Sequence, residues 1–170
     1  GYSGDDIVRN QLILFAVVFL ISTSASAQTA SETRDFIARK MAACRDTGAT
    51  AVVADDSSLR IVEGGWIGEE KVMRGYCQIA WNDIKDVSVR KNSKHDGYDV
   101  VIEGDLKFFE LPHAQLRYVS EGTHTYKQVR TGKTCVFKAY LCGSTESEKI
   151  KKAVKHMATT KGAKLEDDMF

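Results

Sequence analysis

Apolar residues at helical spacing define two segments, one near each end of the part of the chain that follows residue 27. In the first segment the spacing i, i+4, i+7 is formed by Ile37, Met41 and Cys44. Thr29 and Glu32 have the spacing of a capping box, so they predict the start of a helix over residues 32–45. Gly48 is expected to end it, and residues 28–50 are predicted to form this N-terminal helical unit.

The second helical segment, residues 146–160, repeats the pattern with Ile150, Val154 and Met157. Thr145 and Glu148 have the spacing of another capping box. Gly162 is expected to stop this helix, and residues 162–170 are predicted to be a flexible tail. Each helix therefore has one apolar face available for packing.

Between the two helices the pattern is that of short strands bounded by Gly, Asp, Asn and Ser. We predict about seven, over residues 51–54, 59–62, 72–84, 87–90, 98–102, 106–111 and 134–141, with a further candidate at 116–119. Gly104 and Asp105 predict a turn that makes a hairpin of the two strands around them. Residues 120–132 are polar and predict a long loop. A run of strands enclosed by helices favours an α+β fold with an antiparallel sheet.

A different pattern precedes residue 28. An unbroken apolar run of ten residues, 12–21, follows Arg9, and Ala25-Ser26-Ala27 has the form of a cleavage site. These are the zones of a bacterial-type secretory signal, so residues 1–27 are predicted to be upstream residues and a cleaved signal peptide. A membrane anchor is the alternative, but a spanning helix needs about 20 apolar residues. We expect a periplasmic or secreted protein with no stable transmembrane anchor after cleavage.

Composition places the chain among ordinary globular proteins, because 43% of its 170 residues are hydrophobic and 28% are charged. Removing residues 1–27 takes away Arg9, Asp5 and Asp6, which changes the formal charge from +1 to +2. Such balance gives no long-range attraction to nucleic acid, which we exclude as a partner. Pro112 is the only proline, so no proline-rich linker divides the chain.

Four cysteines, an even number, follow the predicted cleavage site: Cys44, Cys77, Cys135 and Cys142. In an exported chain they favour disulfides, and three pairings are open. We favour a Cys44–Cys77 bond, which would fasten the first helix to the sheet; buried free thiols are the alternative. No pair has the spacing of a redox centre, a haem attachment or a zinc site.

The run from Cys77 to Val89 contains Trp81-Asn-Asp-Ile-Lys-Asp-Val87, which resembles the W-x-D-I-x-x-V strand of pleckstrin-homology-like (PH/PTB-like) domains. The passage from the strand ending at Leu141 into the helix 146–160 resembles the closing strand and helix of that fold. The resemblance covers residues 51–161. It implies a strongly bent antiparallel sheet or small barrel of about seven strands, with the C-terminal helix plugging one open end. The N-terminal helix precedes the residues that the resemblance covers.

The same resemblance implies core positions for Trp81 and Ile84. Some members of the family bind phosphoinositides through basic loops, and others bind peptides beside the last helix. Residues 51–74 contain three basic residues, Arg60, Lys71 and Arg74, so phosphoinositide binding is not expected.

Candidate binding residues come from two places. The polar loop carries His124, Tyr126, Lys127 and Arg130, and long polar loops with aromatic residues often hold binding sites. The last helix has a basic face that includes Lys152 and Lys155, although a solvated face is the preferred explanation of such lysines. The four histidines have no metal-ligand spacing, and no nucleophile has a recognisable catalytic setting.

We therefore predict no catalytic, cofactor-binding or metal-binding residues. The leading hypothesis is an exported, non-enzymatic binding or interaction module that takes a peptide by strand addition, in a pocket or sheet-edge groove beside the last helix. Its partner is an unidentified peptide, protein or envelope component. Two alternatives stay open: a small secreted enzyme, hydrolytic or thiol-dependent, and an envelope protein that contacts anionic lipid through its basic C-terminal helix.

Overall fold

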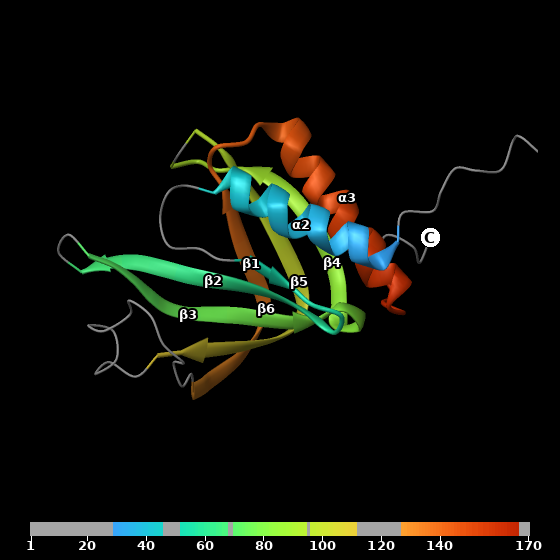
Figure 1. Cartoon of the computed structure of the whole chain (residues 1–170), viewed down its shortest axis with the longest axis horizontal. Coiled ribbons are helices and arrows are strands. Elements are labelled where there is room, and N and C mark those ends of the chain that lie inside the picture. Colours follow the sequence, from blue (N-terminus) through green and yellow to red (C-terminus); the bar gives the residue numbers. More distant parts are fainter. Residues whose placement is uncertain (1–28, 46–51, 68–69, 95, 112–126, 167–170) are drawn as a thin grey trace, which may run out of the picture.

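The computed structural model describes residues 29–45, 52–67, 70–94, 96–111 and 127–166. Along the chain, helix α2 precedes six strands and helix α3 follows them (Figure 1). The elements are α2 Ala30–Cys44, β1 Val52–Ala54, β2 Ser58–Ile67, β3 Glu70–Ala80, a 3-10 turn η1 Trp81–Asp83, β4 Ile84–Lys91, β5 Tyr98–Glu110, β6 Lys127–Ala139 and α3 Ser144–Thr160. The predicted α+β class is confirmed, with one antiparallel sheet.

The sheet is open and the described residues contain six of its strands, so it is not the closed barrel that was one of the two expectations. Its order is β1-β2-β3-β5-β4, with β6 on the other side of β5. The predicted signal peptide and the predicted strand 116–119 lie outside the described residues, as do Gly48 and Gly68.

β5 organises the sheet because it exchanges partners along its length. Residues 98–104 pair with β4, whereas residues 107–110 pair with β3. At Gly104 the backbone has a φ of +157°, and a Cβ there would stand 2.2 Å from the carbonyl oxygen of Asp83. The predicted hairpin around Gly104 is therefore wrong. The glycine is needed for close approach to η1 within one bent strand, and not for a turn.

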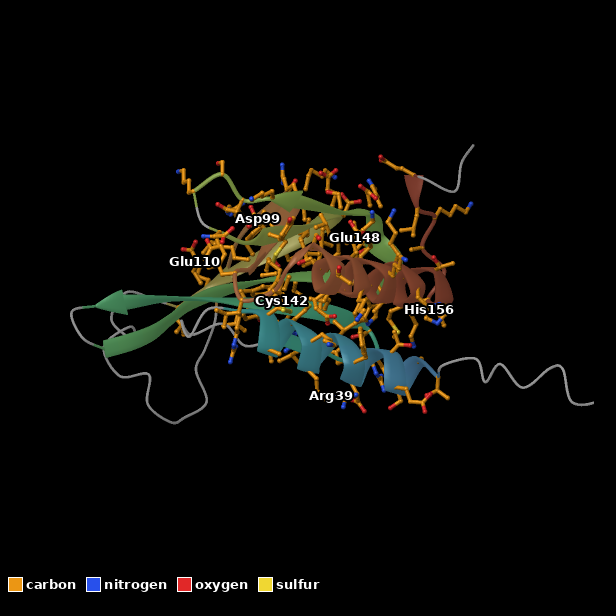
Figure 2. All side chains as sticks on the ribbon, turned by 90° about the horizontal axis from the view of Figure 1, so that it is seen from above. Arg39, Asp99, Glu110, Cys142, Glu148 and His156 are labelled. Atoms are coloured by element: carbon orange, nitrogen blue, oxygen red, sulfur yellow. A yellow bond between two sulfur atoms is a disulfide. The ribbon has the colours of Figure 1, made fainter. Side chains whose placement is uncertain are left out.

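The two helices lie side by side and antiparallel over one face of the sheet (Figures 1 and 2). Their predicted inner faces are confirmed, because the six residues of the two apolar patterns are all 0% exposed: Ile37, Met41, Cys44, Ile150, Val154 and Met157. Trp81 and Ile84 are each 1% exposed, as expected for core residues. The indole N–H of Trp81 donates to the carbonyl oxygen of Asp55 at 2.8 Å, so its one polar atom is satisfied in the core.

Among the described residues, those predicted to begin or end a helix do so in the structure, with one exception. Thr29 and Glu32 form the predicted capping box of α2. The second predicted capping box is wrong, since α3 begins earlier, with Gly143 at its N-cap, and this places Thr145 inside the first turn. At the other end Gly162, with φ +91°, lets the N–H groups of residues 162 and 163 bond the carbonyls of Thr159 and Ala158.

The segment after α3 is not wholly a free tail. Ala163 is 7% exposed and Leu165 is 3% exposed, and both belong to the hydrophobic core. Residues 163–165 therefore fold back onto the body of the protein, in contrast to the expectation of flexibility from Gly162 onward. Residues 167–170 lie outside the described residues.

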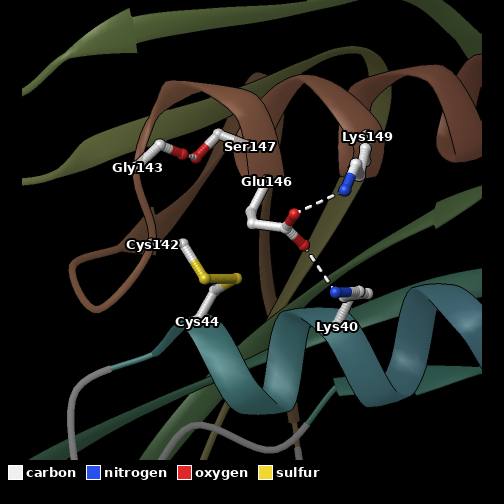
Figure 3. The surroundings of a disulfide bond; sticks show 7 residues. All are labelled: Lys40, Cys44, Cys142, Gly143, Glu146, Ser147 and Lys149. Atoms are coloured by element: carbon white, nitrogen blue, oxygen red, sulfur yellow. Dashed lines mark hydrogen bonds and ion pairs between the residues drawn. A yellow bond between two sulfur atoms is a disulfide. The ribbon is translucent and has the colours of Figure 1, made fainter.

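All four cysteines form disulfides, Cys44–Cys142 and Cys77–Cys135. The favoured Cys44–Cys77 pairing and the alternative of free thiols are therefore both wrong. α2 ends where the link into α3 begins, which brings Cys44 to Cys142 with their Cα atoms 4.9 Å apart (Figure 3). Two disulfides are typical of proteins that fold in an oxidising compartment.

The second disulfide joins two strands that are both neighbours of β5. Cys77 of β3 stands opposite Phe108 of β5, and Cys135 of β6 stands opposite Ile102 of β5. In a flat sheet the strands on either side of β5 would lie about 10 Å apart. The Cα atoms of the two cysteines are 6.4 Å apart, so the bend of β5 brings them together across its inner side. Within the described residues, no helix is both long and apolar enough to span a membrane.

Candidate functional site

The candidate binding residues divide between two ends of the molecule. Lys127 and Arg130 lie in the first half of β6, which begins at the end of the sheet remote from the helices (Figure 1). His124 and Tyr126 lie outside the described residues. The part of the predicted loop from residue 127 onward is strand, so that part of the prediction is wrong.

The two lysines of α3 have different surroundings. The ammonium group of Lys155 lies 3.0 Å from a carboxylate oxygen of Asp86, so this residue joins α3 to β4. Lys152 is exposed and lines a groove between the two helices. Of the four predicted residues that the structure describes, Lys127 and Arg130 therefore lie in β6, and Lys152 and Lys155 lie in α3.

The first half of β6 is open to solvent on both faces. Every residue from 127 to 134 is exposed except the half-buried Gly132, and Val129 is 46% exposed. Burial begins at Cys135, which is 2% exposed. One edge of β6 pairs with β5 along its length, and no strand among the described residues pairs with the other edge. Unpaired edges present backbone N–H and C=O groups that another chain can bond.

The charge of β6 has one sign. Lys127–Ala139 contains four basic residues, Lys127, Arg130, Lys133 and Lys138, and no acidic residue. Lys133 is paired with Asp105, which also faces the ammonium group of Lys85 at 3.3 Å. Hydrogen bonds from Lys133 and then Lys85 hold the pKa of Asp105 below its ordinary value. Lys127 and Lys138 form no ion pair with any described residue.

Arg130 has an aromatic partner rather than an acidic one. Its guanidinium carbon lies 3.6 Å from the ring centroid of Phe108, on the neighbouring strand β5. The same ring lies against Gly132, where a Cβ would stand 2.6 Å from a ring carbon. Stacking on the ring holds the guanidinium near the strand while its N–H donors stay exposed to a ligand.

A hollow of about 480 Å³ adjoins the middle of this strand. It is lined by Asp83, Asp105, Leu106, Lys107, Thr131, Gly132 and Lys133. These residues come from η1, β5 and β6, which meet where β5 bends at Gly104. The hollow carries carboxylates and ammonium groups together, so it suits a polar group of a ligand better than a wholly apolar one.

Strand and hollow together are suited to binding an extended chain. An added strand would pair with the free edge of β6, and alternate side chains would fall on the two exposed faces. No group of His, Cys, Asp and Glu side chains suited to a metal ion occurs in the described part of the chain.

Sequence reasoning missed the hollow because Gly104-Asp105 has the composition of a turn, and so Asp105 was assigned to a connection. The second half of β6 was predicted, but its first half was missed because both of its faces are exposed, which leaves no alternation of apolar and polar residues to detect. The one available signal was charge: four basic residues and no acid in thirteen positions. Comparison with known proteins found no match to a family model, a curated protein or a solved structure.

Proposed function

We propose that this chain is an exported, non-enzymatic binding module that takes an extended acidic segment of a peptide or protein by strand addition to β6. The observation that carries the proposal is the first half of β6. It is an edge strand, exposed on both faces over residues 127–134, and this stretch contains three basic residues and no acidic one. An acidic partner is the occupant that this charge favours.

Main-chain pairing supplies part of the affinity and side chains supply the preference. Each added hydrogen bond contributes about 0.5–1.5 kcal/mol net. Lys127 and Lys138, which have no ion-pair partner among the described residues, and Arg130 on its aromatic support attract carboxylates on the added strand. Because these groups are exposed, the attraction is screened by salt, and binding is expected to weaken as ionic strength rises.

Lysines on an edge strand have a second known use, because they discourage edge-to-edge aggregation. The two roles differ in outcome. If the charges only protect the edge, neutralising them promotes self-association and leaves acidic peptides without effect. If they bind a partner, reversing them abolishes peptide binding at a concentration where the protein is still monomeric.

Export and fold are parts of the same proposal. The segment 1–27 with its signal-peptide pattern and two disulfides support a periplasmic or secreted protein. A relation to pleckstrin-homology-like domains is supported by the bent antiparallel sheet and by the buried face of the helix that follows its last strand.

The alternatives have less support. A thiol-dependent enzyme needs a free cysteine, and all four cysteines are in disulfides. A lipid-binding basic helix needs unpaired lysines, but Lys149, Lys151 and Lys155 of α3 each face an acidic side chain within 3.5 Å.

The test uses residues 28–170 with both disulfides formed and a fluorescent eight-residue peptide of alternating Glu and Val, followed by fluorescence anisotropy. We expect saturable binding that weakens at least about tenfold in a Lys127→Glu, Arg130→Glu variant. A tenfold change in the dissociation constant corresponds to about 1.4 kcal/mol of binding free energy. A Lys161→Glu, Lys164→Glu variant is the matched control, since it reverses two exposed charges on the far side of the fold.

A second peptide, N-methylated at alternate residues, keeps its charge but cannot pair along one edge. It is expected to bind far more weakly than the unmodified peptide. Equal binding of the two peptides, or equal binding to the two charge-reversed variants, would show that strand addition to β6 is wrong.

A further inference from the structure

A second hollow lies between the outward sides of α2 and α3. Its volume is about 330 Å³. The lining residues are Thr33 and Phe36 of α2 with Lys149, Lys152, Ala153 and His156 of α3. Figure 2 shows His156 on the side of α3 that faces α2. None of these residues belongs to the strand site, so this hollow is independent of the function proposed above.

Small side chains and fixed helix ends explain why the groove exists. The hydroxyl of Thr33 donates to the carbonyl oxygen of Thr29 at 3.1 Å, which keeps this side chain against its own helix. Ala153 opposite is short and half-buried. Cys44–Cys142 holds the helices together at one end, and Glu146 joins Lys40 of α2 to Lys149 of α3 next to it (Figure 3). The groove is therefore a fixed feature of the helix pair.

The lining combines an apolar floor with a basic rim. Phe36 and Ala153 are the apolar residues, and Lys149, Lys152 and His156 are basic. No acidic side chain of the described residues lines the groove. Lys149 is neutralised by Glu146 at 2.6 Å, but Lys152 and the His156 ring have no side-chain partner among the described residues. The available charge of the groove is thus positive.

We propose that this groove binds a small amphiphilic anion, a molecule with one carboxylate or phosphate head and a short apolar body. The head lies between Lys152 and His156, and the apolar body covers Phe36 and Ala153. The volume is at the lower end of the roughly 300–1,000 Å³ typical of small-molecule sites. Because the groove is open along one side, we expect a dissociation constant on the order of 0.1–1 mM.

The test is a two-dimensional NMR titration of the disulfide-bonded chain 28–170 with four probes of equal chain length: decanoate, decyl phosphate, decanol and decyltrimethylammonium. Both anions are expected to shift the amide signals of residues around Phe36, Ala153 and His156, with saturation, and to leave those of residues 127–134 unchanged. The better of the two anions identifies whether the head is a carboxylate or a phosphate.

Two variants locate the site. Lys152→Ala, His156→Ala is expected to weaken decanoate at least about fivefold, whereas Lys151→Ala, Lys164→Ala, which removes two charges outside the groove, leaves the affinity unchanged. Ala153→Leu keeps the charges and fills the floor, so it is expected to abolish saturable shifts; its thermal unfolding shows that it is folded. The acidic peptide is expected to bind all three variants equally, which separates this site from β6.

Equal binding of decyltrimethylammonium and decanoate, or unchanged decanoate affinity in both groove variants, would overturn the proposal. So would the absence of saturable shifts at 5 mM decanoate, roughly five times the weakest affinity expected.

Discussion

The part of the sheet beneath the helices and the part beyond Gly104 differ in what their side chains contact. Beneath α2 and α3, residues such as Val87, Val100 and Ile102 are 0% exposed and belong to one hydrophobic core. Beyond Gly104, Leu106 still belongs to that core, but aromatic contacts also lie near the surface. Tyr76 stacks on Phe109 with centroids 4.6 Å apart, and both residues are only half-buried.

The difference separates stability from binding. Burial of apolar surface is the dominant favourable contribution to folding, so most of the free energy of unfolding comes from the helix-covered part. The first half of β6 buries little and contributes little, and its edge groups and charges are therefore available to a ligand. Five expected outcomes sharpen this division or contradict it.

The largest effect is expected from the disulfides that reinforce the helix-covered part and its boundary. In the chain-entropy account each bond, closing loops of 98 and 58 residues, contributes about 4 kcal/mol to the free energy of unfolding. We expect Cys44→Ala, Cys142→Ala and Cys77→Ala, Cys135→Ala each to lose about this much in urea denaturation. Hydrogen exchange should then show the first variant loosened at the helices and the second at β3 and β6. Loosening of the same residues in both variants would contradict the division.

A pair of truncations compares the two parts directly. Ile150 is 0% exposed beneath the helices, and Ile150→Ala is expected to cost about 3 kcal/mol because it leaves a cavity. Val129 is 46% exposed in β6, and Val129→Ala is expected to change the free energy of unfolding by less than about 0.5 kcal/mol. Urea denaturation measures both. A cost above 1.5 kcal/mol for the second variant, roughly the upper value for a surface contact, would show that β6 supports the fold.

Two glycines at the bend allow a finer comparison. Gly104→Ala places a Cβ 2.2 Å from a backbone oxygen that cannot move away, so we expect a loss of about 2–3 kcal/mol in thermal or urea unfolding. Gly132→Ala meets the ring of Phe108, which can rotate, and about 1 kcal/mol is expected. If the order of the two variants is reversed, the bend of β5 does not depend on the approach of η1.

The capping box tests the start of α2 alone. The hydroxyl of Thr29 accepts from the backbone N–H of Glu32, while the Glu32 carboxylate accepts from the N–H of Thr29. Thr29→Ala is expected to lower the free energy of unfolding by about 1 kcal/mol. Thr29→Ser keeps the hydroxyl and serves as the control. A loss of equal size in both variants would point to a cause other than the cap.

The smallest effect concerns acid stability. Hydrogen bonds from Lys149 and then Lys40 lower the pKa of Glu146 from 4.5 to about 2. A carboxylate whose pKa is lowered on folding stabilises the protein fully above its unfolded pKa, and loses this contribution as the pH falls through the folded value. We therefore expect Glu146→Gln to lower the urea midpoint at pH 6, with a difference that shrinks below about pH 4.5 and is absent near pH 2. The exposed Glu166, changed to Gln, is the control; a difference that persists at pH 2 would be inconsistent with this explanation.

The same division explains what the sequence could predict. α2 and α3 each bury one face, so Ile37, Met41, Ile150 and Val154 repeat at helical spacing and reveal both helices. The first half of β6 buries neither face and has no such repeat. The spacing of apolar residues along a sequence reflects which faces are buried. A strand that is exposed on both faces therefore shows no such periodicity.

The candidate site was harder to predict than the core for a related reason. Charge singled out Lys127, Arg130 and Lys152, and the structure places the first two in β6 and the third in α3. The disulfides depend on the bend of β5, which brings Cys77 and Cys135 together, and no local spacing encodes that bend. The sequence shows a glycine at position 104, where β5 bends. Its role, to allow the close approach of η1, becomes clear only in the structure.

The place of Cys135 along β6 has a consequence for assembly. The bond to Cys77 anchors the strand at the residue where exposure ends, so the oxidised chain cannot release β6 and exchange it with a second molecule. Edge strands with free ends are otherwise common routes to domain-swapped oligomers. Reduction would remove that restraint and allow the second half of β6 to be exchanged.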